Sequence, residues 1–214
     1  MTVAAITVAR SKSVTVVTPE VGYDRGMGRW QPDARGRLTK AAFELYGERG
    51  FEQTTVAEIA ERAGLTERTF FRHFVDKREV LFAGAGALNE LLVGTIAEAP
   101  EGLAPIEAAA AGVEAAGAFL QEGRELAKQR QAIILASPEL QERELIKLAA
   151  LAAALADALR ARGVEDPVAS LAAEAAITAF KVAFGRWVGE DDPPDLPRLV
   201  RESLQELRAV TASA

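Results

Sequence analysis

The sequence contains no cysteine and only one histidine, His73. Without cysteine the chain can form no disulfide, no thiolate metal site and no cysteine nucleophile. One histidine is too few for the zinc sites that proteins build from several histidines. We therefore expect neither a bound metal nor a cofactor.

Long hydrophobic runs are also missing. No apolar run approaches the roughly 20 residues that a membrane-spanning helix needs. The short apolar stretch near the N-terminus has no basic region before it, which makes it a poor secretory signal. We expect a cytoplasmic protein that does not contact a membrane.

Alanine and leucine dominate the composition, and hydrophobic residues make up 49% of the 214 positions. After the first twenty residues, clusters of β-branched residues are few, which favours helices over strands. The net charge of −6 argues at first against nucleic-acid binding. Residues 29–82, however, contain ten Lys or Arg against nine Asp or Glu, so the acidic excess lies elsewhere. The prediction is an all-α protein.

Residues 1–30 differ from the rest of the chain. Short stretches with strand propensity are broken by the glycines of GYDRGMG, which is typical of a flexible extension. An alternative is an arm that reaches into DNA, because Arg29, Arg35 and Arg37 lie just before or within the first predicted helix. We predict an extension at 1–30, a DNA-binding domain at 31–82, and a ligand-binding and dimerisation domain at 83–214.

The ends of the first helices can be read from the sequence. A helix from about Gly36 to Arg49 should stop at Gly50, with Phe51 packing back on Tyr46. Thr55 and Glu58 form a capping-box pattern that begins the second helix. The third helix should begin after a Thr66 cap, with Leu65 and Phe70 as a hydrophobic staple.

The later helices are marked by caps and breaks. A box of Asp76 and Glu79, with Val75 and Val80 as its staple, should begin a fourth helix that runs over 77–98. Ser137 and Asp166 should cap helices that open on Pro138 and Pro167. The remaining predicted helices are 104–121, 124–136, 138–162, 167–189 and 195–210.

The second and third helices are joined by the tight turn Ala63-Gly64-Leu65, which predicts a helix-turn-helix. On the third helix Phe70 and Phe74 point to one side, whereas Arg68, Phe71 and Arg72 point to another. Arg68 is placed to pair with guanine in the major groove. The alternative is an ordinary amphipathic helix whose arginines are only solvated.

Residues 35–82 resemble the DNA-binding domain of the TetR (tetracycline-repressor-like) family. The shared pattern includes TTVxxIAxxAGLT and TFFRHFxDKxE. The resemblance implies operator binding as a homodimer, with phosphate contacts from Thr54, His73 and Lys77. Phe71 stands where the family usually has a tyrosine, so a hydroxyl contact to phosphate is lost here. The predicted DNA-binding residues are Arg37, Thr54, Thr55, Thr66, Glu67, Arg68, Phe71, Arg72, His73 and Lys77.

The C-terminal half is less informative. Phe180, Phe184 and Trp187 recur at helical spacing, which is typical of core packing or of a dimer seam, and less often of a ligand pocket. The predicted ligand-binding residues are Phe119, Arg130, Ile134, Phe180, Phe184 and Trp187.

A second resemblance concerns residues 130–163, which are similar to the C-terminal domains of mycofactocin-regulator-like TetR proteins. It implies a small-molecule effector that is acyl-coenzyme-A-like or otherwise largely apolar. The last two helices are the predicted dimer elements, because Ala172, Ala176, Ala179 and Ala183 would let a partner helix approach closely.

Three functions compete. The favoured hypothesis is a repressor, without catalytic activity, that binds a palindromic operator and is released by an effector. An enzyme is the second, but no Ser-His-Asp set, phosphate loop or metal-ligand cluster is present. Glu139, Glu142 and Glu144 cluster after a helix start, where the helix dipole favours acidic side chains, so we interpret them as structural. The third hypothesis is a helical ligand-binding protein that has lost DNA binding.

Overall fold

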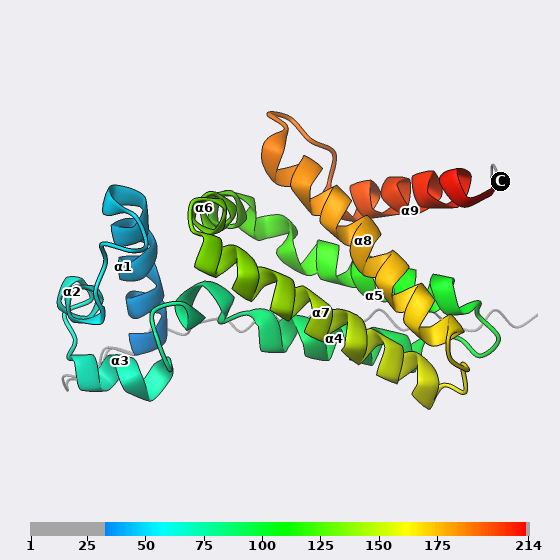
Figure 1. Cartoon of the computed structure of the whole chain (residues 1–214), viewed down its shortest axis with the longest axis horizontal. Coiled ribbons are helices and arrows are strands. Elements are labelled where there is room, and N and C mark those ends of the chain that lie inside the picture. The colour runs from blue at the N-terminus through cyan, green and yellow to red at the C-terminus, as the bar shows by residue number, and fades with distance from the viewer. Residues whose placement is uncertain (1–32, 213–214) are drawn as a thin grey trace, which may run out of the picture. The chain divides into compact units, whose positions relative to one another are not determined.

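The computed structural model describes residues 33–212, and all regular structure in that range is helical. The predicted all-α class is confirmed, whereas the predicted extension at 1–30 lies outside the described residues. The elements are α1 (Ala34–Arg49), α2 (Val56–Arg62), α3 (Glu67–His73), the 3₁₀ turn η1 (Glu79–Phe82), α4 (Ala85–Glu98), α5 (Pro105–Leu120), the 3₁₀ turn η2 (Gln121–Gly123), α6 (Arg124–Leu135), α7 (Pro138–Ala161), α8 (Val168–Gly189) and α9 (Leu196–Ala212) (Figure 1).

The first three helices begin and end as predicted. At the end of α1, Gly50 has a φ of 88° and its N–H donates to the Tyr46 carbonyl at 3.0 Å. The Phe51 ring then packs edge-on against Tyr46, with 5.3 Å between ring centroids. Both halves of the capping box at Thr55 and Glu58 are present at the start of α2. Thr66 caps α3 by accepting the Thr69 N–H at 3.2 Å.

The predicted fourth helix is instead two pieces, η1 and α4. Asp76 accepts the Glu79 N–H at 3.0 Å, as the box requires. The Glu79 carboxylate, however, pairs with Arg143 and lies 3.8 Å from the Lys147 ammonium, so it does not reach back to complete the box. Val75 is 83% exposed, and the predicted staple with buried Val80 is therefore wrong.

Two predicted caps are also wrong, because their side chains are used elsewhere. The Ser137 hydroxyl donates to Glu52 across the fold at 3.2 Å and makes no cap hydrogen bond. The Asp166 carboxylate binds the Arg160 guanidinium and accepts the Ser170 hydroxyl. The helix α8 then begins at Val168, one residue later than predicted.

The described residues bury two hydrophobic cores. One combines α1–α3 and η1 with three residues of later helices, Ile133, Ile134 and Leu140. The other is built from α4, α5, α7, α8 and α9 around fully buried Trp187. Because α6 and the start of α7 complete the first core, the three N-terminal helices are packed together with part of the bundle (Figure 1).

The alanine side of α8 is buried within the chain. Ala172, Ala176, Ala179 and Ala183 are each at most 7% exposed and belong to the second core. Their small side chains let neighbouring helices of the same chain approach α8. The prediction that this side receives a dimer partner is therefore wrong; the exposed side of α8 carries Leu171 and Val182 instead.

The expectation about membrane segments also needs a correction. Two stretches, Glu79–Glu98 and Val168–Gly189, are long and apolar enough to cross a membrane by length and composition alone. Core helices of soluble proteins pass the same test. In α8 much of the apolar character comes from residues that the second core buries, including Ile177, Phe180 and Trp187.

Candidate functional site

The turn between α2 and α3 is tight and is braced by an arginine. Gly64 has a φ of 63°, a conformation that favours glycine, and the Leu65 N–H donates to the Ala60 carbonyl at 2.8 Å. The Arg37 guanidinium donates to the Ala63 carbonyl and lies 3.5 Å from that of Gly64. A Cβ at Gly64 would come within 2.9 Å of this guanidinium. Arg37, predicted to contact DNA, therefore holds the turn together.

The two faces of α3 are divided as the sequence predicts. Phe70 is 0% exposed and Phe74 4%, and their rings pack 5.4 Å apart in the first core. Phe71 is 55% exposed, and Arg68 and Arg72 are exposed with no ion pair among residues 33–212. Thr66 and Glu67 are also exposed at the start of the helix. The result is a solvent-facing surface with two free cations and one aromatic ring, which suits contact with DNA.

Lys77 is half-buried, and its ammonium is held by the backbone. Its ammonium donates to three backbone carbonyls, those of Phe51 at 2.9 Å, Glu52 at 3.3 Å and Thr54 at 3.0 Å, and lies 4.3 Å from the Phe51 ring centroid. An ammonium has three donors, and all three are used. In this conformation Lys77 joins the segment after α3 to the loop before α2, so the predicted phosphate contact would require the ammonium to leave these carbonyls.

The Tyr46 hydroxyl strengthens this junction by donating to the Lys77 carbonyl at 2.6 Å. Burial raises the pKa of Tyr46 well above its usual range, and the charge of Asp76 adds to the effect. The hydroxyl therefore stays protonated and remains a donor at any physiological pH.

Three further predicted DNA contacts are occupied or turned inward. Thr54 is buried, and its hydroxyl donates to the Gly50 carbonyl at 2.8 Å. The Thr55 hydroxyl serves the capping box with Glu58. His73 is half-buried, and its Nε2 is enclosed without a hydrogen-bond partner in the described structure. Five of the ten predicted residues, Thr66, Glu67, Arg68, Phe71 and Arg72, are thus gathered on the exposed side of α3.

A cavity of about 600 Å³ lies where the two cores meet. Five of the six predicted ligand residues line it: Phe119, Arg130, Ile134, Phe180 and Phe184. Trp187 does not, because it is 0% exposed in the second core. Part of the wall comes from α1 and η1, through Thr39, Phe43, Val80 and Leu81. The lining is mostly apolar, with a few charged groups.

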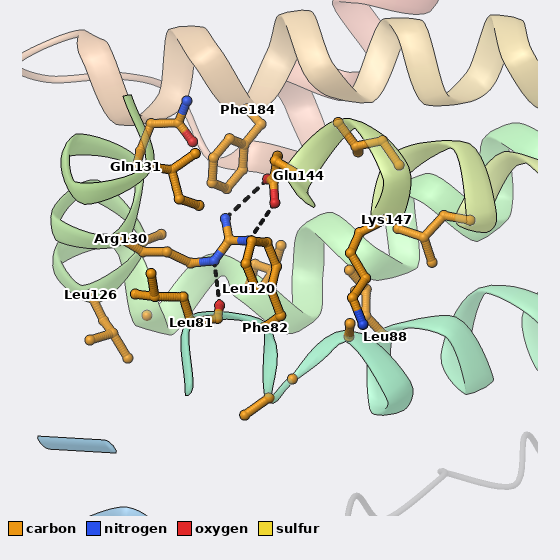
Figure 2. Close-up of a pocket in the computed structure, with 18 of the residues that line it drawn as sticks. Leu81, Phe82, Leu88, Leu120, Leu126, Arg130, Gln131, Glu144, Lys147 and Phe184 are labelled. Atoms are coloured by element: carbon orange, nitrogen blue, oxygen red, sulfur yellow. Dashed lines mark hydrogen bonds and ion pairs between the residues drawn. The ribbon is translucent and has the colours of Figure 1, made fainter. Parts of the chain in front are cut away.

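Arg130 makes the densest set of polar contacts in the cavity wall (Figure 2). Its Nε donates to the Leu81 carbonyl at 2.7 Å, and its two terminal nitrogens donate to the Glu144 carboxylate at 3.1 and 2.6 Å. The guanidinium carbon also lies 5.0 Å from the Phe82 ring centroid. Arg130 thereby connects α6, α7 and η1.

Sequence reasoning missed that the cavity reaches the N-terminal helices. The sequence indicates only a structural role for Glu144, as an acidic residue near a helix start, whereas its carboxylate binds Arg130 across the break at Ser137-Pro138. Nothing in the sequence indicates that Thr39 and Phe43 line the cavity. Helical spacing on α1 is the same for residues that face a core and for residues that face a cavity.

Two family models match the chain. Residues 38–83 match the model of bacterial regulatory proteins of the tetR family, and residues 103–212, just over half of the chain, match the MftR C-terminal domain. The chain belongs to the TetR family. Both resemblances drawn from the sequence are confirmed.

Individual relatives of this TetR-family protein share parts of it. The transcriptional regulator TcmR of Streptomyces glaucescens is 39% identical over 74 residues, which are 35% of this chain and 33% of that protein. MftR of Mycobacterium tuberculosis is 25% identical over 119 residues, 56% of this chain and 60% of that protein. The chain thus spans one third and three fifths of these relatives' lengths.

Among solved structures, the regulator FadR from Bacillus subtilis in complex with stearoyl-CoA is 23% identical, with a TM-score of 0.55. The match covers 80% of this chain and 96% of that one. The likeness shows that the two share a fold. The curated relatives are transcriptional regulators rather than enzymes.

Proposed function

We propose that this TetR-family chain is a ligand-responsive transcriptional repressor. It would act in the cytoplasm as a homodimer that binds a palindromic operator and is released by a small, largely apolar effector. One observation carries the proposal: Phe43, Val80 and Leu81 both line the cavity and belong to the core that holds α3. A molecule in the cavity would therefore contact residues of the core on which α3 packs, and the exposed side of α3 carries Arg68 and Arg72.

The exposed side of α3 supports operator binding. Arg68 lies near the start of the helix, where a recognition helix reaches base edges, and it is free to pair with guanine. Thr66 and Glu67 lie beside it, and Arg72 can reach phosphate. Two copies related by a two-fold axis would read half-sites about 34 Å apart or at multiples of that spacing.

The cavity supports an effector with an apolar part. Its volume falls within the roughly 300–1,000 Å³ of small-molecule sites, and leucine and phenylalanine side chains form much of its lining. The FadR relative is described with stearoyl-CoA, and the C-terminal match is to the MftR domain. We therefore propose an acyl-CoA or another ligand with an acyl-like tail.

The proposed mechanism is a shift between two populations. An effector that binds better to a conformation with wrongly spaced recognition helices weakens operator binding. The operator must then weaken effector binding by the same factor.

A second candidate is a helical ligand-binding protein without DNA binding. It is favoured by Lys77, Thr54 and Arg37, three predicted DNA-contacting residues whose side chains form hydrogen bonds within the protein. Phe71 also lacks the hydroxyl that would bind phosphate.

Selection of binding sequences from a random or genomic DNA pool, at one stated salt concentration, separates the two candidates. Recovery of a short inverted repeat is the result expected for a dimeric repressor, and its genomic positions would locate the target genes. Recovery of nothing above background would overturn the repressor in favour of the second candidate.

A further inference from the structure

Polar contacts add to the apolar packing of Ile133, Ile134 and Leu140 where the N-terminal helices meet α6 and α7. Gln129 of α6 donates to the Phe43 carbonyl of α1 at 3.1 Å, and Arg78 pairs with Glu139 of α7 at 2.7 Å. Glu79 of η1 pairs with Arg143 and lies 3.8 Å from the Lys147 ammonium. Partly exposed ion pairs each contribute little free energy. These polar contacts can therefore be exchanged for others at lower cost than the buried apolar contacts beside them.

Arg130 differs from the other members of this attachment. Its side chain is 22% exposed and that of its partner Glu144 is 24% exposed, so water screens this pair less than it screens Arg78 and Glu139. Both side chains line the cavity. The same guanidinium holds the Leu81 carbonyl in η1, the turn that follows α3 in the chain. A change in the conformation of Arg130 would therefore alter the cavity wall and, through the bond to Leu81, the position of η1 beside the DNA-binding helices.

The charges around the cavity indicate which effector group would act there. Its lining contains three cations, Arg130, Lys147 and Lys181, against one carboxylate, Glu144. Arg130 pairs with Glu144, and Lys147 lies 3.8 Å from the Glu79 carboxylate. Lys181 is exposed and forms no ion pair among the described residues, so it supplies the uncompensated positive charge of the wall. The excess of cations favours an anionic group on the effector.

We propose that Arg130 is the positioning residue through which the cavity controls the DNA-binding helices, and that an anionic group of the effector displaces Glu144 from it. The inference rests on the proposed function and deepens it. When the guanidinium turns to the effector, its Nε–H leaves the Leu81 carbonyl. That partly buried acceptor loses its donor, which favours a new position of η1 and of the helices before it.

The cysteine-free chain allows a direct test by spin-label distances, without DNA or effector. Labels at Glu61→Cys on α2 and Gln205→Cys on α9 lie at exposed positions and report the N-terminal helices against the bundle. Labelled chain is mixed with excess unlabelled chain, so that only distances within one chain are measured. Arg130→Met should broaden or shift the distance distribution relative to the same labelled chain with Arg130 intact.

Arg124→Met is the matched control. Arg124 lies on the same helix and also donates to backbone carbonyls, those of Trp187 and Glu190, but it does not line the cavity. It should leave the distribution unchanged. A distribution for Arg130→Met that superimposes on the parent would overturn the proposal, and so would an equal change in both variants.

Glu144→Gln guards against the case in which Arg130→Met fails to fold. It keeps the shape of the side chain but removes the charge that holds the guanidinium in place. The Arg130 bond to Leu81 should then form only part of the time, so the distribution should change in the same direction as in Arg130→Met, but less. Thermal unfolding of each variant shows which ones are folded. No change in folded Glu144→Gln, with Arg130→Met unfolded, would count against the proposal.

The effector step is tested with three probes of equal tail length, below their micellar concentrations: dodecanoate, dodecanol and dodecyltrimethylammonium. Dodecanoate should lower operator affinity about tenfold, and the other two less. In Arg130→Met, dodecanoate should still bind but change operator affinity no further. An equal effect of dodecanol, or an undiminished effect of dodecanoate on Arg130→Met, would overturn the proposal. If the parent chain binds no DNA, the proposed repressor fails, while the label distances still decide the coupling.

Discussion

The two cores of this molecule are built from different side chains. The first, around α1–α3 and η1, buries Tyr46 and five phenylalanines: Phe43, Phe51, Phe70, Phe74 and Phe82. The second is rich in alanine and has Trp187 and Phe180 as its buried aromatic residues. Large rings let short helices of seven residues bury enough surface to be held, whereas alanines let long helices lie close together. Replacing a ring in the first core should therefore leave a cavity, and enlarging an alanine in the second should cause a clash.

The largest effect is expected from Phe70→Ala. Removing this fully buried ring should lower the free energy of unfolding by roughly 3–5 kcal/mol. The neighbouring Phe71→Ala removes the same ring from a 55% exposed position and should change stability by less than about 1 kcal/mol. Urea unfolding of the two variants measures the difference. Equal losses would mean that the inner and outer sides of α3 are wrongly assigned.

The second core should respond to added volume. Ala176 is 0% exposed in the middle of α8, so Ala176→Leu should destabilise the chain by about 1–3 kcal/mol through overpacking. Ala175→Leu, at the half-buried neighbouring position, is the control and should cost less. Thermal unfolding at matched protein concentration checks both. A stabilised Ala176→Leu would reveal unfilled space in this core.

Lys77→Ala distinguishes a structural lysine from a DNA contact. The loss of three hydrogen bonds to carbonyls should lower the free energy of unfolding by about 1–3 kcal/mol. The dependence of operator affinity on salt should keep its slope, because no phosphate contact is removed. Urea unfolding and a salt titration measure the two effects. A slope that falls by about one unit, with unchanged stability, would restore the phosphate contact expected from the family resemblance.

Arg68→Ala should leave stability unchanged and act on DNA recognition alone. The expected loss is about 1–3 kcal/mol at one base position, with relaxed specificity there. Competition binding with single-base variants of the selected operator measures it. Arg49→Ala, which removes a cation that is paired with Glu58 away from α3, is the control. An unchanged base preference in Arg68→Ala would exclude Arg68 from sequence readout.

The smallest effect concerns acid stability of the first core. Burial raises the pKa of Asp76, but hydrogen bonds from Arg78 and from the Glu79 N–H lower it by more than burial raises it. The pKa of Asp76 therefore lies below its usual range. A carboxylate with a lowered folded-state pKa stabilises the fold above its ordinary pKa of about 4, and the contribution is lost as the pH falls through the folded value. Melting temperatures should therefore fall toward acid less steeply in Asp76→Asn than in the parent chain. Parallel pH profiles would show that Asp76 gives no such stabilisation.

The parts of the fold that the sequence predicted are those set by local rules. Gly50, Thr55 and Thr66 terminate or begin helices through bonds within four residues, so their roles follow from spacing alone. The inward and outward sides of α3 follow from helical periodicity in the same way. The prediction for Ser137 is wrong because its hydroxyl bonds to Glu52, which is far away in the sequence. The prediction for Val75 is wrong because its side chain is exposed to solvent and does not pack on Val80.

The candidate site was predictable only in part, for the same reason. The exposed residues of α3 were identified because they need no partner. The hydrogen bonds of the Lys77 ammonium are made to carbonyls more than twenty residues away in the sequence. The Arg130–Glu144 pair joins two helices across a helix break. Both are products of tertiary packing that periodicity does not encode.

Three residues of later helices belong to the first core, and they limit which domains of this regulator can be exchanged with those of other proteins. Ile133, Ile134 and Leu140 complete the hydrophobic packing of the N-terminal helices from more than fifty residues further along the chain. A chimaera that joins residues 33–82 to a foreign sensing domain would leave that core open on one side. A graft that retains specificity must therefore transfer matching α6 and α7 surfaces, so the unit of exchange is larger than the helix-turn-helix itself.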